Sequence, residues 1–147
     1  MMQATVLYVE DEEADVFFVK RAFTRLHASN SLRVVRNGRD AEDYLAGIGR
    51  FSDRQRYPLP GMVLLDLKLP GIQGLDVLEW MRQQPQFQSL PVVIFSSSDM
   101  EADRDRAIQL GVNDYIVKPI DMSKVSELLS LVFNRFLKLD AAESVET

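Results

Sequence analysis

The sequence contains no cysteine, which excludes disulfide bonds, thiolate metal sites and cysteine nucleophiles. Its single histidine, His27, excludes metal sites built from several histidines. It has no run of about 18 apolar residues that could span a membrane, and no basic start and apolar block typical of a secretory signal. The 17 Lys and Arg are outnumbered by 22 Asp and Glu, which argues against nucleic acid as a partner. We therefore expect an acidic cytoplasmic protein that binds neither nucleic acid nor membrane.

The 147 residues suit one domain, and their pattern predicts its fold class. Short apolar runs alternate with longer amphipathic stretches, and several runs are continuous, which is typical of strands buried on both faces of a parallel sheet. The runs are Val6–Val9, Leu32–Val35, Met62–Leu65, Val92–Phe95 and Tyr115–Val117. The stretches predict helices at Glu13–Leu26, Asp40–Ala46, Gly74–Gln83 and Glu101–Leu110, and a last helix that Asp121 could cap and that continues to Leu139. This alternation predicts an α/β fold with a doubly wound, five-stranded parallel sheet of the flavodoxin-like type. We expect the domain to cover residues 1–139, followed by a short acidic tail at 140–147 and no output domain.

Polar side chains stand where the predicted strands end, the edge at which open α/β sheets bind ligands. Glu10 and Asp11 follow the first strand, Asp66 the third, Ser96 the fourth and Lys118 the fifth. If the first strand lies between the second and the third, the carboxylates become neighbours and repel each other unless a cation intervenes. Mg²⁺ prefers oxygen ligands and keeps several waters. The cluster therefore predicts a Mg²⁺ site with open coordination positions, which Mn²⁺ would also fit.

The open positions suggest phosphoryl transfer. An aspartate carboxylate can act as a nucleophile and form an aspartyl phosphate, and the charge on the phosphoryl oxygens must be neutralised. Lys118 would supply a second positive charge and Ser96 a hydrogen bond. Each residue alone also has an ordinary structural explanation, such as a turn cap for Asp66 or a solvated helix start for Glu10 and Asp11. Their joint placement at successive strand ends carries the prediction.

With these residues in place, the chain resembles the receiver domain of two-component response regulators from Thr5 to Phe136. The resemblance rests on four segments: Val9–Asp11, Leu64–Gly71, Pro91–Ser96 and Gly111–Pro119. It implies that Asp66 is the phosphoacceptor and that Asp11 and Asp66 bind the metal directly. Glu10 would act through a water molecule, and the backbone carbonyl of Lys68 would be the third protein ligand.

The resemblance also implies how such a chain signals. Lys118 would bind the phosphoryl group and be followed by a cis peptide bond to Pro119. Ser96 would be the switch hydroxyl and Tyr115 the switch aromatic. A sensor histidine kinase would donate the phosphoryl group, and the surface formed by the fourth helix, fifth strand and fifth helix would then change its binding preference. The only chemistry implied is the chain's own phosphorylation and dephosphorylation, so it would not be an enzyme in the usual sense.

Several features outside these four segments indicate which partners the chain could bind. The chain resembles stand-alone receivers of two kinds, the chemotaxis-type regulators and the small regulators paired with bacterial phytochromes. The long connection at 47–61 and the acidic start at 10–15 favour the second kind. Leu131, Leu137 and Leu139 widen the apolar stripe of the last helix, which predicts either a homodimer through the fourth-helix, fifth-strand, fifth-helix surface or a few tolerated exposed leucines. Phe17 and Asp15 are candidate kinase contacts. The downstream target cannot be named from the sequence.

Other functions fit less well. A haloacid-dehalogenase-like phosphatase needs a second aspartate two residues after the nucleophile, and Lys68 occupies that position. A flavodoxin-like cofactor binder needs a phosphate loop after the first strand, where this chain has a run of acids at 10–13. A pseudo-receiver that only docks proteins, or a phosphorelay shuttle without its own output, is the remaining alternative.

Overall fold

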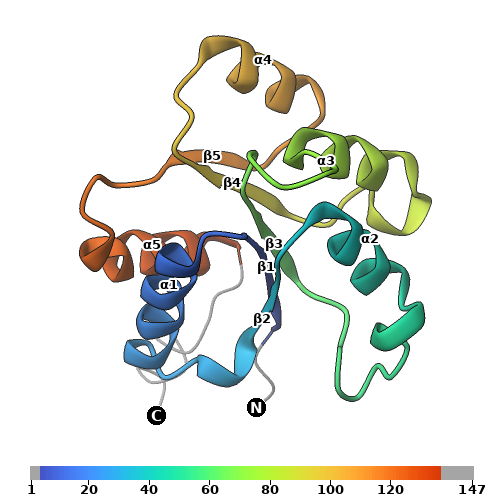
Figure 1. Cartoon of the computed structure of the whole chain (residues 1–147), viewed down its shortest axis with the longest axis horizontal. Helices are drawn as coiled ribbons and strands as arrows, with labels where there is room; N and C mark the ends of the chain where they lie inside the picture. The colour runs from blue at the N-terminus through green and yellow to red at the C-terminus, as the bar shows by residue number, and fades with distance from the viewer. Residues whose placement is uncertain (1–3, 137–147) are drawn as a thin grey trace.

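A five-stranded parallel sheet forms the centre of the molecule (Figure 1). The computed structural model describes residues 4–136. The strands are β1 (Val6–Val9), β2 (Leu32–Val35), β3 (Met62–Leu65), β4 (Val92–Ser96) and β5 (Asp114–Val117). Their order is β2-β1-β3-β4-β5, so β1 lies between β2 and β3 as the prediction of neighbouring carboxylates required. The doubly wound α/β sheet predicted from the sequence is confirmed.

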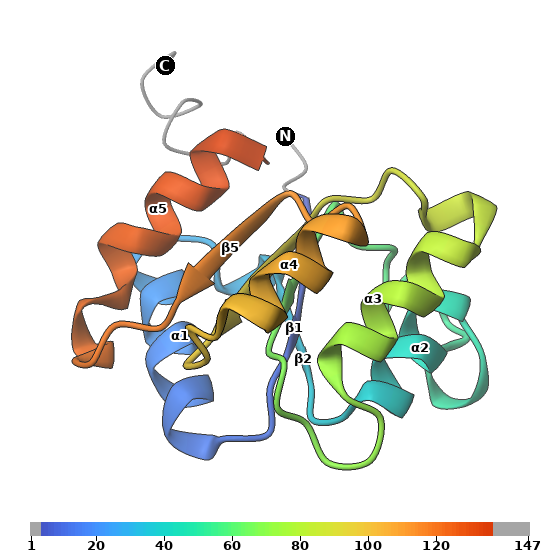
Figure 2. The same ribbon diagram turned by 90° about the horizontal axis from the view of Figure 1, so that it is seen from above.

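Helices cover both faces of the sheet (Figures 1 and 2). The helices α1 (Glu13–Arg25) and α5 (Val125–Phe136) share one face. The other face is covered by α2 (Gly38–Ala46), α3 (Gly74–Gln83) and α4 (Glu101–Gln109). One-turn 3-10 helices lie at Ser29–Ser31, Gly49–Phe51, Pro85–Phe87 and Met122–Lys124. Asp121, predicted as the cap of the last helix, instead caps the 3-10 turn at Met122–Lys124 by accepting from the Ser123 N–H, and α5 begins only after this turn.

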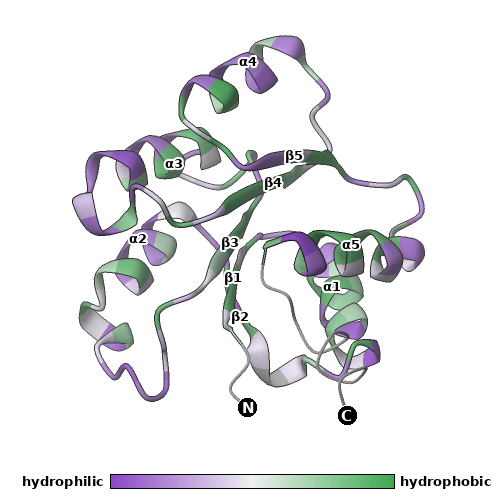
Figure 3. Cartoon of the chain, turned by 180° about the vertical axis from the view of Figure 1, so that it is seen from behind, coloured by the Kyte–Doolittle hydropathy of each residue, from purple (hydrophilic) through white to green (hydrophobic). Residues whose placement is uncertain are grey.

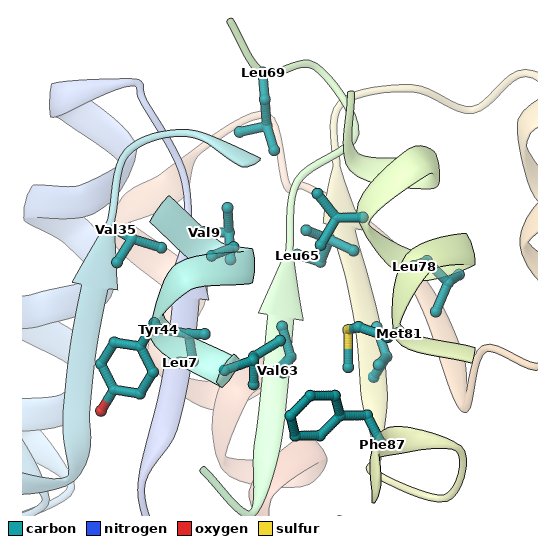
Figure 4. Packing of buried hydrophobic residues seen from close by; sticks show 14 of the residues in the cluster. Leu7, Val9, Val35, Tyr44, Val63, Leu65, Leu69, Leu78, Met81 and Phe87 are labelled. Atoms are coloured by element: carbon teal, nitrogen blue, oxygen red, sulfur yellow. The ribbon is translucent and has the colours of Figure 1, made fainter. Parts of the chain in front are cut away.

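Two apolar clusters explain why the strand sequences are continuous rather than alternating. Odd positions of β1 and β3, such as Leu7 and Leu65, pack beneath α2 and α3 (Figure 4). Even positions, such as Tyr8 and Leu64, pack beneath α1 and α5. Burying one such side chain contributes about 1.5–3 kcal/mol relative to leaving it exposed. Figure 3 shows the result, with hydrophobic strands at the centre and a largely hydrophilic α4 outside.

Two further predictions concern the end of the chain and the segment after β5. Leu137, Leu139 and the predicted tail at 140–147 lie outside the described residues, as does the predicted domain boundary at 139. The predicted cis bond between Lys118 and Pro119 is wrong, since no peptide bond in the described part of the chain is cis. The trans form of an X–Pro bond is intrinsically favoured by about 0.5–1 kcal/mol, and the next residue, Ile120, is fully exposed rather than packed into a tight turn.

Between residues 4 and 136, no helix combines the length and the apolar character needed to cross a membrane.

Candidate functional site

The backbone places three predicted site residues just beyond the strands that precede them. The Glu10 N–H donates to the Val35 carbonyl at 3.0 Å, and the Asp66 N–H donates to the Val9 carbonyl at 3.1 Å. Both bonds continue the parallel ladder by one residue. Because β1 and β3 are neighbours, the two carboxylates emerge side by side from one edge of the sheet. The Lys118 N–H extends the β4–β5 pairing in the same way.

The Lys118 side chain crosses to these carboxylates and is 8% exposed. Its Nζ lies 2.5 Å from Glu10 Oε1, 2.7 Å from Asp15 Oδ2 and 3.3 Å from Asp66 Oδ2. Burial alone would lower the pKa of Lys118, but its hydrogen bonds to Asp15 and Glu10 outweigh this effect and raise it. The lysine therefore stays charged at neutral pH and provides a fixed cation beside Asp66.

Glu10 is fully buried and its oxygens already accept several hydrogen bonds. Oε1 accepts from Lys118 and from the Tyr8 hydroxyl at 3.2 Å, and Oε2 accepts from the Glu12 N–H at 3.2 Å. Burial raises the pKa of Glu10 to about 7, opposed by the hydrogen bond from Lys118 and assisted by the charge of Asp66. Burial likewise raises the pKa of Tyr8, so its hydroxyl remains a donor.

Asp66 is 4% exposed and held firmly at its base. Its Oδ1 accepts from the Leu67 N–H at 2.7 Å, which fixes the orientation of the carboxylate. The first residue of α3, Gly74, packs directly against the Asp66 backbone, where a Cβ would lie 2.1 Å from the Asp66 carbonyl oxygen. A glycine at this position therefore allows α3 to approach the phosphoacceptor candidate closely.

The acidic side chains at this edge fit a hard divalent cation. Carboxylate oxygens of Glu10, Asp11 and Asp66 lie within 4.8 Å of one another. Since Glu10 is also the carboxylate occupied by Lys118 and Tyr8, the exposed Asp11 and the pocket-facing Asp66 are the better direct ligands.

Two of these carboxylates, Asp11 and Asp66, border an open pocket with a volume of about 580 Å³. Asp11, Asp66, Lys68 and Lys118 line it, which brings four predicted site residues to one cavity. The remaining lining residues are Glu12, Asp15, Leu69, Pro70, Gln73 and Ser97. The pocket is large enough for a phosphoryl group and a hydrated cation.

The two predicted switch residues lie beside the pocket and meet through Ser98. Ser96 is fully buried and its hydroxyl accepts from the Ser98 N–H at 3.3 Å. The Tyr115 hydroxyl donates to the Ser98 carbonyl at 2.9 Å, and the Arg104 guanidinium lies 4.8 Å from the centre of the Tyr115 ring. The Ser98 hydroxyl also donates to Asp103 of α4 at 2.6 Å. Tyr115 is thus tied to the start of α4.

Sequence reasoning missed one participant in this site. Asp15 is predicted above only as a kinase contact, yet its carboxylate binds Lys118 and its side chain is 20% exposed. The signal was its position four residues after Asp11, in the first turn of α1. Phe17, two residues further, is 57% exposed as expected.

Comparisons with known proteins agree with this geometry. The sequence model of the response regulator receiver domain matches residues 6–130. The probable methanogenesis regulatory protein FilR2 of Methanothrix harundinacea is 36% identical over 115 residues, covering 78% of this chain and 72% of its own. Response regulator Rcp1 of Synechocystis is 30% identical over 124 residues, covering 84% and 82%. The phosphate regulon transcriptional regulatory protein PhoB of Escherichia coli is 26% identical, and this chain spans 58% of its length.

Solved structures give the same result. The phosphorylated cyanobacterial phytochrome response regulator RcpA superimposes with a TM-score of 0.84 at 28% identity, covering 92% of this chain and 94% of that one. The Mn²⁺-bound form of Rcp1 superimposes with a TM-score of 0.79 at 28% identity, covering 93% and 96%. The chain therefore belongs to the response regulator receiver domains, the phosphoryl-accepting regulators of two-component phosphorelays.

Proposed function

We propose that Asp66 accepts a phosphoryl group from the phosphohistidine of a sensor histidine kinase. The observation that carries this proposal is the meeting of Asp66, Lys118 and Asp11 in one open pocket, with the Glu10 carboxylate close by. An Asp66 carboxylate oxygen forms the new O–P bond as the P–N bond to the histidine breaks, and the imidazole leaves with the electron pair. Lys118 donates to a phosphoryl oxygen and the buried Ser96 hydroxyl approaches another. The chain acts on no other substrate.

A divalent cation completes the site in this proposal. Asp11, Asp66 and the backbone carbonyl of Lys68 would hold Mg²⁺ or Mn²⁺ directly, and Glu10 would act through water. When bound, the ion neutralises charge on the phosphoryl oxygens. The Mn²⁺-bound structure of Rcp1 supports a cation in an acidic pocket of this kind.

The signal leaves through the surface formed by α4, β5 and α5. Movement of Ser96 toward the phosphoryl group changes its contact with Ser98, which also holds Tyr115 and the start of α4. Tyr115 then turns inward and the two states of this surface exchange population. Ser96 in place of a threonine keeps the hydroxyl needed for this step.

The partners in this proposal are a phytochrome-type kinase and a second copy of the chain. The likeness to RcpA and Rcp1 supports a phytochrome kinase. Ile108 and Ile120, which are 68% and 107% exposed, support a homodimer through the α4–β5–α5 surface. Leu131, the only one of the three predicted leucines that is described, instead lines a shallow groove with Leu26, the residue that follows α1. The downstream target is a protein that reads this surface.

The test is intact mass after incubation with acetyl phosphate, with Mg²⁺ or with EDTA, for wild type and Asp66→Asn. We expect a single phosphate adduct that requires both Mg²⁺ and Asp66. An adduct that persists in Asp66→Asn would place the phosphoryl group elsewhere. If neither acetyl phosphate nor a purified phytochrome kinase gives an adduct, the chain is better described as a docking-only receiver. We do not expect this result, because the set of site residues is complete.

A further inference from the structure

Asp15 holds the same ammonium that the phosphoryl group must use. Its Oδ2 lies 2.7 Å from Lys118 Nζ, its side chain is 20% exposed, and it lines the pocket beside Asp66. Asp15 comes from the first turn of α1, whereas Lys118 follows β5, so this contact links two elements that are far apart in the chain. The proposed function assigns Asp15 no role.

The donors of Lys118 are fully used in this arrangement. An ammonium has three N–H groups, and Glu10, Asp15 and Asp66 accept from it at 2.5, 2.7 and 3.3 Å. The contact with Asp66 is the longest of the three. A phosphoryl group on Asp66 brings three more acceptor oxygens that need the same donors. Asp15 therefore competes with the phosphoryl group for Lys118.

Charge acts in the same direction. Asp15 adds a negative charge to a pocket wall that an anionic phosphodonor must approach, next to Asp11 and Glu12. Lys118 would still be anchored without Asp15, because the fully buried Glu10 binds it at the shorter distance of 2.5 Å. Loss of the Asp15 charge would leave that anchor in place.

We propose that Asp15 is a positioning residue that draws Lys118 away from Asp66 and slows phosphorylation of the chain. The inference rests on the proposed function, since it concerns the rate at which Asp66 is phosphorylated.

The experiment compares initial rates of phosphorylation by acetyl phosphate in Mg²⁺ for wild type, Asp15→Asn and Asp15→Glu. Glu13→Gln is the matched control, because it removes one charge from the same helical turn at a side chain that is 83% exposed and pairs with Arg36. We expect Asp15→Asn to be about 3- to 10-fold faster, the effect of removing one charged hydrogen-bond competitor. Glu13→Gln and Asp15→Glu should stay near the wild-type rate.

A second readout separates competition for Lys118 from a purely structural role. Beryllofluoride mimics the phosphoryl group without being transferred, and its affinity in Mg²⁺ can be followed by fluorine NMR. Asp15→Asn should bind it about 3- to 10-fold more tightly, whereas a structural tether between α1 and β5 would change only the melting temperature.

The outcomes are distinct. If wild type forms an adduct that requires Asp66 but Asp15→Asn is slower than wild type, or no faster than Glu13→Gln, the role given to Asp15 is wrong and the proposed function stands. An Asp15→Asn variant with unchanged beryllofluoride affinity would also show that the role given to Asp15 is wrong. If wild type forms no adduct with acetyl phosphate or with kinase, the proposed function fails and the inference fails with it.

Discussion

The ammonium of Lys118 and the carboxylate of Asp66 lie 3.3 Å apart although 52 residues separate them in the chain. The parallel sheet brings them together, because β5 and β3 flank β4 and all three end at the same edge. Lys118 also pairs with the fully buried Glu10, so one cation offsets carboxylates from two strands and from α1. Lys118 is therefore expected to affect the stability of the fold as well as the phosphorylation of Asp66.

Replacing Lys118 by methionine should destabilise the protein in a pH-dependent way. The change keeps the side-chain length but leaves Glu10, Asp15 and Asp66 without their cation. We expect urea unfolding at pH 8 to give a free energy of unfolding lower by about 1–3 kcal/mol, the cost of leaving buried acceptors without their donor. Because Glu10 already has a raised pKa of about 7, it should take up a proton at pH 6 and reduce the loss there. Lys20→Met, at an exposed position of α1, should be close to neutral at both pH values. An equal loss at pH 6 and pH 8 would contradict this account.

Magnesium binding should weaken as the pH falls through about 7. Burial raises the pKa of Glu10 from 4.5 to about 7, so between these values the folded, metal-free protein binds more protons than the unfolded chain. Its stability should decrease as the pH rises through this range. Mg²⁺ favours the charged carboxylate and releases the proton. The gain in melting temperature on adding Mg²⁺ should therefore be larger at pH 8 than at pH 6.

Glu10→Gln is the control for this pH dependence. It keeps the shape of the side chain but removes the titrating group, so its response to Mg²⁺ should be nearly the same at both pH values. A wild-type response that is also independent of pH would show that Glu10 is already charged in the metal-free protein.

Much of this molecule follows from local patterns in the sequence. The runs at Met62–Leu65 and Val92–Phe95 predict strands because both of their faces are buried, and a strand that ends in a single polar residue identifies Asp66. The contact between Asp15 and Lys118 does not follow from such patterns, since it joins residues 103 positions apart. An acid in the first turn of a helix is already explained by its favourable interaction with the helix dipole. The sequence around Asp15 therefore gives no separate sign of its contact with Lys118.

Gly74→Ala should damage both the stability and the site. The new Cβ would lie 2.1 Å from the Asp66 carbonyl oxygen and 2.8 Å from Leu67 Cα, so α3 or the end of β3 must move. We expect a loss of about 1–3 kcal/mol in the free energy of unfolding, as for other overpacked cores, and slower phosphorylation because Asp66 shifts. Asp76→Ala, in the same helical turn with a side chain that is 59% exposed, should leave both nearly unchanged. A Gly74→Ala variant with wild-type stability and rate would show that α3 is not fixed against Asp66.

Tyr115→Phe should separate phosphorylation from its consequence. The variant loses the hydrogen bond to the Ser98 carbonyl but keeps the ring beneath Arg104. The variant leaves Asp66, Lys118 and the acidic cluster untouched. The rate of phosphorylation by acetyl phosphate should therefore stay within about twofold of wild type, a smaller change than the loss of a hydrogen bond within the site itself would cause. The change that phosphorylation causes in amide chemical shifts of α4 and β5 should become smaller, because one link between Ser98 and Tyr115 is gone.

Tyr57→Phe is the matched control for this variant, because it removes a tyrosine hydroxyl at a different place in the fold. The half-buried Tyr57 ring packs against Tyr44 and Phe51, in the apolar cluster beneath α2 and α3. It should leave the chemical-shift response of α4 and β5 intact. If Tyr115→Phe responds to phosphorylation as fully as wild type, Ser98 does not pass the signal through Tyr115. The bond from the Ser98 hydroxyl to Asp103 would then be the connection to α4, and Asp103→Asn should show the loss instead.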